Sequence, residues 1–291
     1  MTGKIFVLGA TGAIGPHLIR ALAAKGATVT AFVRSADKVE KLAGVTAVGG
    51  DIHDLAAFTA AVQGHERIFI LTADTFNYAY EAKLAAAAVA AGVKHVVKLS
   101  AIDASDNAEV GSITHSHGVA EKAVLAAVPD TPVTILRPGF FIQNILRQAA
   151  EVKFASSLTS NYGQARVAFI DAADIADVAA TVLTSPIDEY KGLSLTLTGP
   201  EALTWDEVVA LLSKEIGKPI KAVDVDDATQ VKGLVSHGLP RRNAWQFAHL
   251  GYYVRRSFTG NSFTTGNIEF VTGNKPRTVA QFFAQNRAAF L

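Results

Sequence analysis

The chain has 291 residues, of which 49% are hydrophobic and 18% are charged, and its formal net charge is +1 at pH 7. This composition supplies a large packed core and excludes an intrinsically disordered chain, while the small net charge gives no indication of nucleic-acid binding. Cysteine is absent, which excludes disulfides, thiolate metal sites and thiol catalysis, and no metal site is predicted. The longest apolar stretch, residues 84–93, is shorter than a membrane span, which needs about 20 residues. The first strand begins at residue 4 and leaves no room for a signal peptide, so we expect a cytoplasmic protein without a membrane partner.

In its first half the chain alternates between short β-rich runs and segments with a helical pattern. The expected strands cover residues 4–8, 28–33, 45–48, 67–72, 94–100 and 133–136. Helices are expected between them at residues 16–25, 35–42, 54–62, 80–91 and 115–127, with Asp54 as the N-cap of the third. The strands are apolar throughout rather than alternating, which is typical of parallel strands covered on both faces. The prediction is therefore an α/β fold with a Rossmann-type, doubly wound parallel sheet.

After residue 139 the pattern changes to a mixture of helices, strands and polar loops. The expected elements are a helix at 140–150, a polar loop at 156–163, strands at 167–170 and 193–198, a helix to 183 capped by Asp171 or Asp174, and helices at 204–216, 226–236, 242–254 and 278–290. Thr204 and Glu207 match a capping box at the start of the helix at 204–216. We predict a nucleotide-binding core at residues 1–139 and a small α+β substrate lobe at residues 140–291, which packs on the core, with some of its segments able to return to the core sheet.

Residues 9–15 read GATGAIG and connect the first expected strand directly to the first helix. A glycine-rich turn at this place brings backbone N–H groups and a helix N-terminus to a diphosphate. The first glycine permits a tight turn, the second lets the backbone approach the pyrophosphate, and the third lets helix and strand pack closely. An ordinary structural turn is the alternative, but the alternation that follows favours a dinucleotide site. The predicted cofactor-binding residues of this loop are Gly9, Thr11, Gly12, Ala13, Ile14 and Gly15.

The end of the second strand distinguishes NAD(H) from NADP(H). NAD-binding proteins usually carry an Asp or Glu about 20 residues after the glycines, where it bonds the ribose 2′-hydroxyl. This chain has Arg34 and Ser35 at that place, with no carboxylate before Asp37. The Arg34 guanidinium suits a 2′-phosphate, and Lys38 adds positive charge one helical turn later. The sequence therefore predicts NADP(H) in preference to NAD(H), with a solvated Arg34 as the alternative.

Other residues of the expected cofactor site follow the third, fourth and fifth strands. Asp51 is expected to reach the adenine amino group, with Ile52 against the ring, and helix capping is the alternative for Asp51. Thr72 and Ala73 end the fourth strand, where small side chains suit a cofactor that passes close by. Ser100 ends the fifth strand at the expected depth of the nicotinamide.

The group that transfers a proton is not marked by the usual motif. None of the six tyrosines has a Lys four residues further on, so the sequence lacks the Tyr-x-x-x-Lys dyad of short-chain dehydrogenases, which disfavours a routine alcohol dehydrogenase. His117 and Glu121 lie four residues apart on the helix after the fifth strand and share one helix face. An imidazole oriented by Glu121 can hold a ribose or donate a proton near neutral pH. An ordinary exposed helix pair is the alternative, and His115 has no such partner.

Several of these motifs occur together and in order. They are GATGAIG at residues 9–15, Arg34, Gly50-Asp51, His117-x-x-x-Glu121, TILRPGFFIQN at residues 134–144 and GPEALTWDE at residues 199–207. Over essentially its whole length, the chain resembles the NmrA-like branch of the atypical short-chain dehydrogenase/reductases. The resemblance implies an NAD(P)-binding Rossmann core with a small C-terminal substrate lobe, and it places His117 at the nicotinamide ribose. It also places Phe140, Phe141 and Asn144 on the stretch that bridges core and lobe.

Members of that family differ in function. Some resemble reductases that pass hydride from NADPH to flat quinones, azo dyes or triphenylmethane dyes, and others resemble redox sensors that bind dinucleotide and regulate a protein partner. We predict an NADPH-dependent reductase of a conjugated, largely apolar small-molecule acceptor, whose proton comes from solvent or His117. The alternative is a non-catalytic sensor that binds a protein. The residues expected to line the acceptor pocket, with a place in the core as the alternative for the aromatic ones, are Phe76, Tyr78, Phe140, Phe141, Asn144, Tyr162, Trp245 and Phe247.

Overall fold

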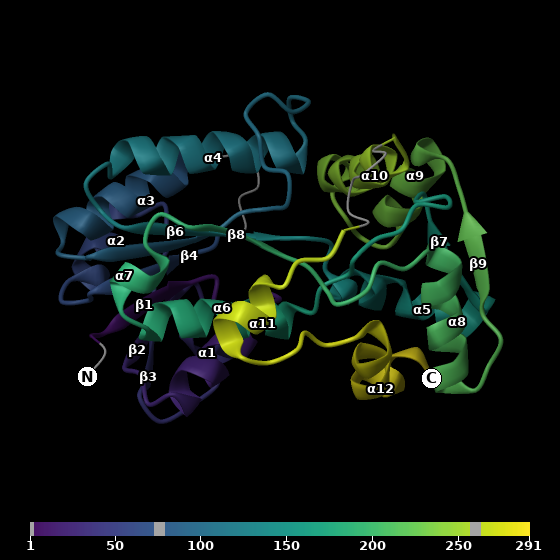
Figure 1. The fold of residues 1–291 in the computed structure, drawn as a ribbon, viewed down its shortest axis with the longest axis horizontal. Coiled ribbons are helices and arrows are strands. Elements are labelled where there is room, and N and C mark those ends of the chain that lie inside the picture. Colours follow the sequence, from purple (N-terminus) through teal and green to yellow (C-terminus); the bar gives the residue numbers. More distant parts are fainter. Residues whose placement is uncertain (1–2, 73–78, 257–262) are drawn as a thin grey trace. The chain divides into compact units, whose positions relative to one another are not determined.

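The computed structural model describes residues 3–72, 79–256 and 263–291 (Figure 1). The chain forms two compact units. The first consists of Met1–Pro138, Ala172–Leu197 and Asn267–Asn274, and the second of Gly139–Asp171, Thr198–Gly266 and Lys275–Leu291. Two segments from beyond residue 139 thus belong to the same unit as the glycine-rich loop. None of the helices in the described part of the chain combines the length and the apolar character that a membrane span requires.

A seven-stranded sheet forms the centre of the first unit, with the strand order β3-β2-β1-β4-β5-β6-β8. The strands are β1 (Ile5–Leu8), β2 (Val29–Val33), β3 (Val45–Gly49), β4 (Arg67–Ile70), β5 (His95–Leu99), β6 (Val133–Pro138) and β8 (Ser194–Leu197). Every neighbouring pair is parallel, so the predicted doubly wound α/β fold is confirmed.

Helices cover both faces of this sheet (Figure 1). One face carries α1 (Gly15–Ala24), α6 (Ala172–Thr184) and α11 (Asn267–Thr272), and the other carries α2 (Leu55–Val62), α3 (Ala79–Ala90) and α4 (Ile113–Ala127). The connections contain the 3₁₀ helix η1 (Ala36–Lys38) and the short helix α7 (Ile187–Tyr190). Because both faces are covered, every residue of β1 and of β5 is buried, which explains the continuous apolar character of β1. In β5 the side chains of His95 and Lys98 are buried as well.

Three phenylalanine rings pack together on the α2 side of the sheet. The ring centroid of Phe6 in β1 lies 5.7 Å from that of Phe32 in β2 and 5.7 Å from that of Phe58 in α2. None of the three side chains is more than 2% exposed. This packing holds β1 and β2 in place, and the carboxyl ends of these two strands carry the glycine-rich loop and Arg34.

The strand order reverses at β1, which pairs with β2 on one side and with β4 on the other. In open parallel sheets, ligands bind outside the carboxyl ends of the strands at such a switch point. The glycine-rich loop begins directly after β1. The topology therefore places this loop where a nucleotide site is expected.

The second unit contains a parallel pair of strands, β7 (Ser157–Ser160) and β9 (Lys221–Asp224). Its helices are η2 (Ile142–Gln148, a 3₁₀ helix), α5 (Ala149–Ala155), α8 (Trp205–Ile216), α9 (Asp227–Ser236), α10 (Arg241–Arg256) and α12 (Val279–Phe290). The predicted capping box of α8 is confirmed, because Thr204 Oγ1 accepts from Glu207 N at 3.2 Å and the Glu207 carboxylate accepts from Thr204 N at 2.8 Å. Thr278 and Gln281 form a second capping box at α12.

Several expectations about local structure are wrong. The expected loop at 156–163 contains β7, because β9, a segment far away in the sequence, supplies its pairing partner. The expected helix at 35–42 is a single 3₁₀ turn, and the expected helix at 140–150 begins as the 3₁₀ helix η2. The expected strand at 167–170 is reduced to two isolated bridges, Phe141 with Ile170 and Val167 with Leu203.

Candidate functional site

The three glycines of the loop after β1 lack a side chain for different reasons. Gly9 has a φ of 75°, in the left-handed region, and a Cβ there would lie 2.8 Å from the Leu71 carbonyl oxygen. A Cβ on Gly15 would lie 2.3 Å from the Gly9 carbonyl oxygen, so this position excludes any side chain. On Gly12 the nearest atom would be 3.4 Å away, so the protein itself leaves room there. The bare backbone at Gly12 keeps the outer face of the loop open, which fits the close approach of a diphosphate.

Helix α1 begins directly behind this loop without a side-chain cap. Ile14 occupies the N-cap position and Pro16 lies at the start of the helix. Thr11, Gly12 and Ala13 are exposed. The first N–H groups of a helix need hydrogen-bond partners, and the positive end of the helix dipole favours an anion. The residues present therefore fit the diphosphate of a dinucleotide.

Arg34 follows β2 and is exposed, as is Lys38 in η1. Within residues 3–72, 79–256 and 263–291, neither cation forms an ion pair, so both can receive an anionic ligand. β2 and β3 pair with Val33 opposite Gly49, which brings the segments after these strands to the same edge of the sheet. This edge is where a 2′-phosphate is expected beside the adenosine.

The capping of α2 is carried out by Asp54, whose Oδ1 accepts from Ala57 N at 3.0 Å, as predicted. Asp51 is exposed, and its Oδ1 accepts from the backbone nitrogen of His53 at 2.9 Å. Ile52 is half-buried beside the core of the first unit. Asp51 is therefore not needed to cap α2, and its contact with an adenine, like that of Ile52, stays a prediction.

A fully buried ion pair lies at the carboxyl ends of β4 and β5. Lys98 Nζ is 2.8 Å from Glu81 Oε2, and the two side chains are 0% and 1% exposed. Lys98 also donates to the Leu99 carbonyl oxygen at 2.8 Å, and Thr72 Oγ1 donates to Glu81 Oε1 at 2.8 Å. The hydroxyl of Thr72 is thus engaged by the protein, so Thr72 can contribute to a cofactor site mainly through its backbone and its small size. Ala73 lies outside the described residues.

A second charged cluster joins α4 to the ends of β5 and β6. The Glu121 carboxylate accepts from Ser100 Oγ and from both Nε and Nη2 of Arg137, with Nε at 2.9 Å from Oε1. Glu121 is 7% and Arg137 31% exposed, and the hydrogen bond to Glu121 raises the pKa of Arg137. Glu121 therefore holds Ser100 and Arg137, which corrects the expectation that it orients His117. The roles expected for Ser100 and Glu121 at a nicotinamide stay predictions.

His117 lies on α4 one turn before Glu121. Burial, and after it the positive charge of Lys98, hold the pKa of His117 well below its usual range. This lowered pKa favours a neutral imidazole near pH 7, and the role of His117 as a proton donor stays a prediction. A neutral imidazole still donates and accepts hydrogen bonds, which is what holding a ribose requires.

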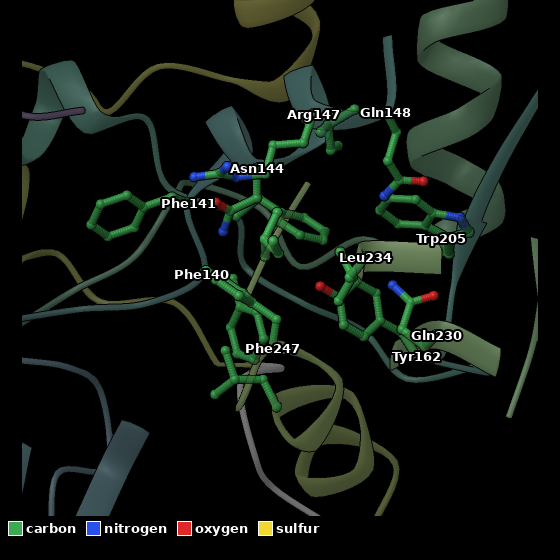
Figure 2. A pocket seen from close by; sticks show the side chains of 14 residues that line it. Phe140, Phe141, Asn144, Arg147, Gln148, Tyr162, Trp205, Gln230, Leu234 and Phe247 are labelled. Atoms are coloured by element: carbon green, nitrogen blue, oxygen red, sulfur yellow. The ribbon is translucent and has the colours of Figure 1, made fainter. Parts of the chain in front are cut away.

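The second unit contains a small cavity bounded by aromatic and amide side chains (Figure 2). Its volume is about 40 Å³, which is room for a few water molecules. Burial raises the pKa of the lining residue Tyr162 to about 12, so the phenol stays protonated at any physiological pH. A more open groove of about 420 Å³ adjoins the cavity and shares Gln148, Gln230 and Leu234 with it.

Most of the residues expected around an acceptor line this cavity. They are Phe140, Phe141, Asn144, Tyr162 and Phe247. Trp245 does not line it; its side chain is 39% exposed and its ring stacks on His249 with 5.0 Å between the centroids. Residues two apart on a helix point in nearly opposite directions, so α10 cannot present both Trp245 and Phe247 to the same cavity. Phe76 and Tyr78 lie outside the described residues.

Sequence reasoning missed four charged residues that the structure brings to these sites. Glu81 and Lys98 form the buried pair, Arg137 binds Glu121, and Arg147 lines the cavity of the second unit. Lys98 could have been noticed because it lies inside a strand between the apolar residues Val97 and Leu99, and Arg137 because it is the charged residue at the end of an apolar strand. The partners of these residues depend on tertiary packing and leave no mark in the sequence.

Comparison with known proteins gives consistent results. The sequence model of the NmrA-like family matches residues 1–282. The "NAD(P)H azoreductase" of Xenophilus azovorans is 32% identical over 289 residues, covering 98% of this chain and 99% of that protein. The "(4-alkanoyl-5-oxo-2,5-dihydrofuran-3-yl)methyl phosphate reductase" of Streptomyces griseus subsp. griseus is 31% identical over 287 residues, covering 98% and 99%. The crystal structure of the NADPH-dependent quinone oxidoreductase QOR2 of Escherichia coli, complexed with NADPH, superposes with a TM-score of 0.83 at 26% identity, covering 97% of this chain and 99% of that one.

Proposed function

Because the chain belongs to the NmrA-like family, as its motifs predicted, we propose that it is an NADPH-dependent reductase of a conjugated, largely apolar acceptor such as a quinone or an azo compound. The observation that carries this proposal is the open backbone at Gly12, which directly precedes a helix without a side-chain cap. Arg34, which has no ion pair among the described residues, follows the neighbouring strand at the same end of the sheet. The activities by which the similar azoreductase and quinone oxidoreductase are named support it. A cytoplasmic location is part of the same proposal.

The cofactor would be held by the first unit. When bound, it supplies the hydride. Gly12 and the first turn of α1 would bind its diphosphate, and Arg34, aided by Lys38, would bind the 2′-phosphate. Asp51 and Ile52 would contact the adenine, while His117, as a neutral imidazole, would hydrogen-bond the nicotinamide ribose. Preference for NADPH over NADH follows from the positive charge at Arg34 and from the absence of a carboxylate that would bond a 2′-hydroxyl.

The acceptor would bind in the aromatic cavity of the second unit. Flat rings such as those of Phe140 and Phe141 suit a conjugated acceptor, and the Tyr162 hydroxyl offers a hydrogen-bond donor. Since the cavity holds only a few water molecules, lining side chains must move apart when a fused ring enters. A reduced quinone or azo nitrogen can take its proton from water, so the reaction does not depend on an acidic side chain.

Two measurements on the purified protein test the proposal. Calorimetric titration with NADPH and with NADH should give tighter binding of NADPH by about tenfold or more, as expected for a charge-assisted contact to the 2′-phosphate. Loss of NADPH absorbance should then be followed with a panel of quinones, azo dyes and enones, and turnover is expected with at least one class. Tighter binding of NADH would contradict the cofactor assignment. Binding of NADPH without oxidation by any acceptor would contradict the reductase and favour a dinucleotide sensor that acts on a protein partner.

A further inference from the structure

Two turns of the helix η2, together with its N-cap residue, supply one wall of the aromatic cavity. Phe141, Asn144 and Arg147 are spaced by three residues along η2 and its N-cap, and all three line the cavity. A 3₁₀ helix has three residues per turn, so side chains at this spacing lie one above the other on the same face. Figure 2 shows the Arg147 side chain extending along this wall toward Asn144 and Phe141. An aromatic ring, an amide and a guanidinium thus form a row.

The positive charge of Arg147 is not neutralised by the protein. Among the residues that the structure describes, Arg147 has no ion pair, and no carboxylate lines the cavity. Glu151, four residues further on, is the usual partner for an arginine on a helical segment. Its Oε1 instead accepts hydrogen bonds from Ser157 Oγ at 2.9 Å and from Thr159 Oγ1 at 2.6 Å. Arg147 is an exposed residue, and its guanidinium keeps its donors for a ligand.

Amide groups that line the same cavity add further donors. Gln148 lines the same cavity, and its Oε1 accepts from Thr159 N at 3.1 Å, which leaves the Gln148 NH₂ group to donate. Asn144 offers a second carboxamide one turn before Arg147. A planar guanidinium with the Asn144 carboxamide one turn before it matches a carboxylate, a sulfonate or a phosphate, since each presents two or more oxygens to paired N–H groups.

We propose that the acceptor of this protein carries an anionic group, which Arg147 binds while the conjugated ring lies against Phe140 and Phe141. This inference names the substrate class of the site described above and rests on the proposed function. The ring packs against the apolar part of the cavity, and the anionic group supplies the negative counter-charge for the Arg147 guanidinium. Arg147 is then the residue that selects anionic acceptors over neutral or cationic ones of the same shape.

Binding without turnover tests this selection directly. Naphthalene-2-sulfonate and its uncharged analogue 2-(methylsulfonyl)naphthalene are titrated by calorimetry into the wild-type protein, Arg147→Gln and Lys232→Gln. Lys232 is an exposed lysine on the adjoining groove, so its variant loses the same charge outside the cavity. We expect Arg147→Gln to weaken the sulfonate by about tenfold and the sulfone by less than about twofold, with Lys232→Gln changing neither. An equal effect of Arg147→Gln on both ligands, or an equal effect of both variants on the sulfonate, would overturn the proposal.

The same variants separate this inference from the proposed function. With NADPH present, 1,2-naphthoquinone and 1,2-naphthoquinone-4-sulfonate are compared as acceptors, and Arg147→Gln should lower kcat/KM about tenfold for the sulfonate alone. Turnover of both quinones with no selective loss in Arg147→Gln would refute the role of Arg147 and leave the reductase standing. Arg147-dependent binding of the sulfonate with no turnover of any acceptor would support the anion site and refute the reductase.

Discussion

Lys98 and Glu81 form an ion pair of 2.8 Å from which solvent is excluded on both sides. The carbonyl oxygen of Leu99 and the hydroxyl of Thr72 satisfy further bonds of the two charged groups. Removing two charges from water is costly, and such a pair is stable only when both partners are present. The pair lies where β4 and β5 deliver residues to the expected nicotinamide region, so its integrity bears on both stability and function.

Breaking this pair from one side should destabilise the protein strongly. Glu81→Gln leaves the Lys98 ammonium buried without a counter-charge, so we expect the free energy of unfolding to fall by about 3–5 kcal/mol in urea denaturation. The double variant Glu81→Gln/Lys98→Met should lose clearly less than the sum of the two single variants, because no charge then remains buried. A loss of under about 1 kcal/mol in Glu81→Gln would show that water reaches the pair in solution.

The charge of Lys98 should also be detectable at His117. The Lys98 cation is the second cause of the low pKa of His117. The variant Glu81→Gln/Lys98→Met should therefore raise this pKa, which NMR of the imidazole protons can follow. The pKa should stay below its usual range, because burial, the larger cause, is unchanged. His65 is the internal control, since its lowered pKa arises from burial and from Lys4 and not from Lys98. An equal rise in the pKa of His65 and in that of His117 would instead indicate that the substitutions loosen the packing of the protein in general.

Stability should fall as the pH drops below neutrality, in part through His95. Its side chain is fully buried, and Nε2 lies 2.8 Å from Thr134 Oγ1, which itself donates to the Tyr190 carbonyl oxygen at 2.7 Å. Burial, with a smaller effect of Arg67, lowers the pKa of His95 from 6.5 to about 4. The unfolded chain therefore binds more protons than the folded one between these values, so stability is lost as the pH falls from 6.5 toward 4.

The expected size of this effect is about 2 kcal/mol between pH 7.5 and pH 5 for His95 alone. His95→Gln retains a donor for Thr134 but does not titrate, so its free energy of unfolding should depend less on pH by about that amount. Urea denaturation of both proteins at the two pH values makes the comparison. Identical pH dependence in the two proteins would mean that His95 titrates normally in the folded state.

Substitution by alanine should have different effects at the second and at the third glycine of the loop after β1. Gly12→Ala meets no atom closer than 3.4 Å, so the thermal unfolding midpoint should stay close to that of the wild type, while NADPH affinity falls about tenfold or more. Gly15→Ala brings a Cβ to 2.3 Å from the Gly9 carbonyl oxygen, so it should lower the unfolding midpoint even without ligand. Unchanged NADPH affinity in folded Gly12→Ala would remove the argument for a diphosphate at this loop.

Reversing the charge at the end of β2 should reverse the cofactor preference. Arg34→Glu places a carboxylate where NAD-binding proteins carry one, so NADPH should bind at least tenfold more weakly and NADH equally well or better. Lys25→Glu, an equal charge change on an exposed residue at the end of α1, is the matched control and should leave the ratio of the two affinities unchanged. Equal NADPH affinity in Arg34→Glu would refute the assignment of a 2′-phosphate contact.

Features that depend on local bonding and on the burial of whole strands were predictable from the amino-acid sequence. The apolar strands predicted the parallel sheet because both of its faces are covered by helices. The glycine loop, the Asp54 cap and the capping box of Thr204 and Glu207 were predictable because each is formed by residues within a few positions of one another.

The contacts between residues far apart in the sequence depend on tertiary packing and were not predictable. The chain pairs β7 with β9 and adds β8 beside β6, although neither pairing is visible in the local pattern. Glu121 was expected to serve His117 on its own helix face, but Ser100 and Arg137 arrive from two neighbouring strands and take both of its oxygens. The pKa of His117 is held below its usual range by partial burial and by the charge of Lys98, a residue of another element. Ion pairs and hydrogen bonds form between groups that are close in space, and these neighbours are determined only when the sheet and its helices have packed.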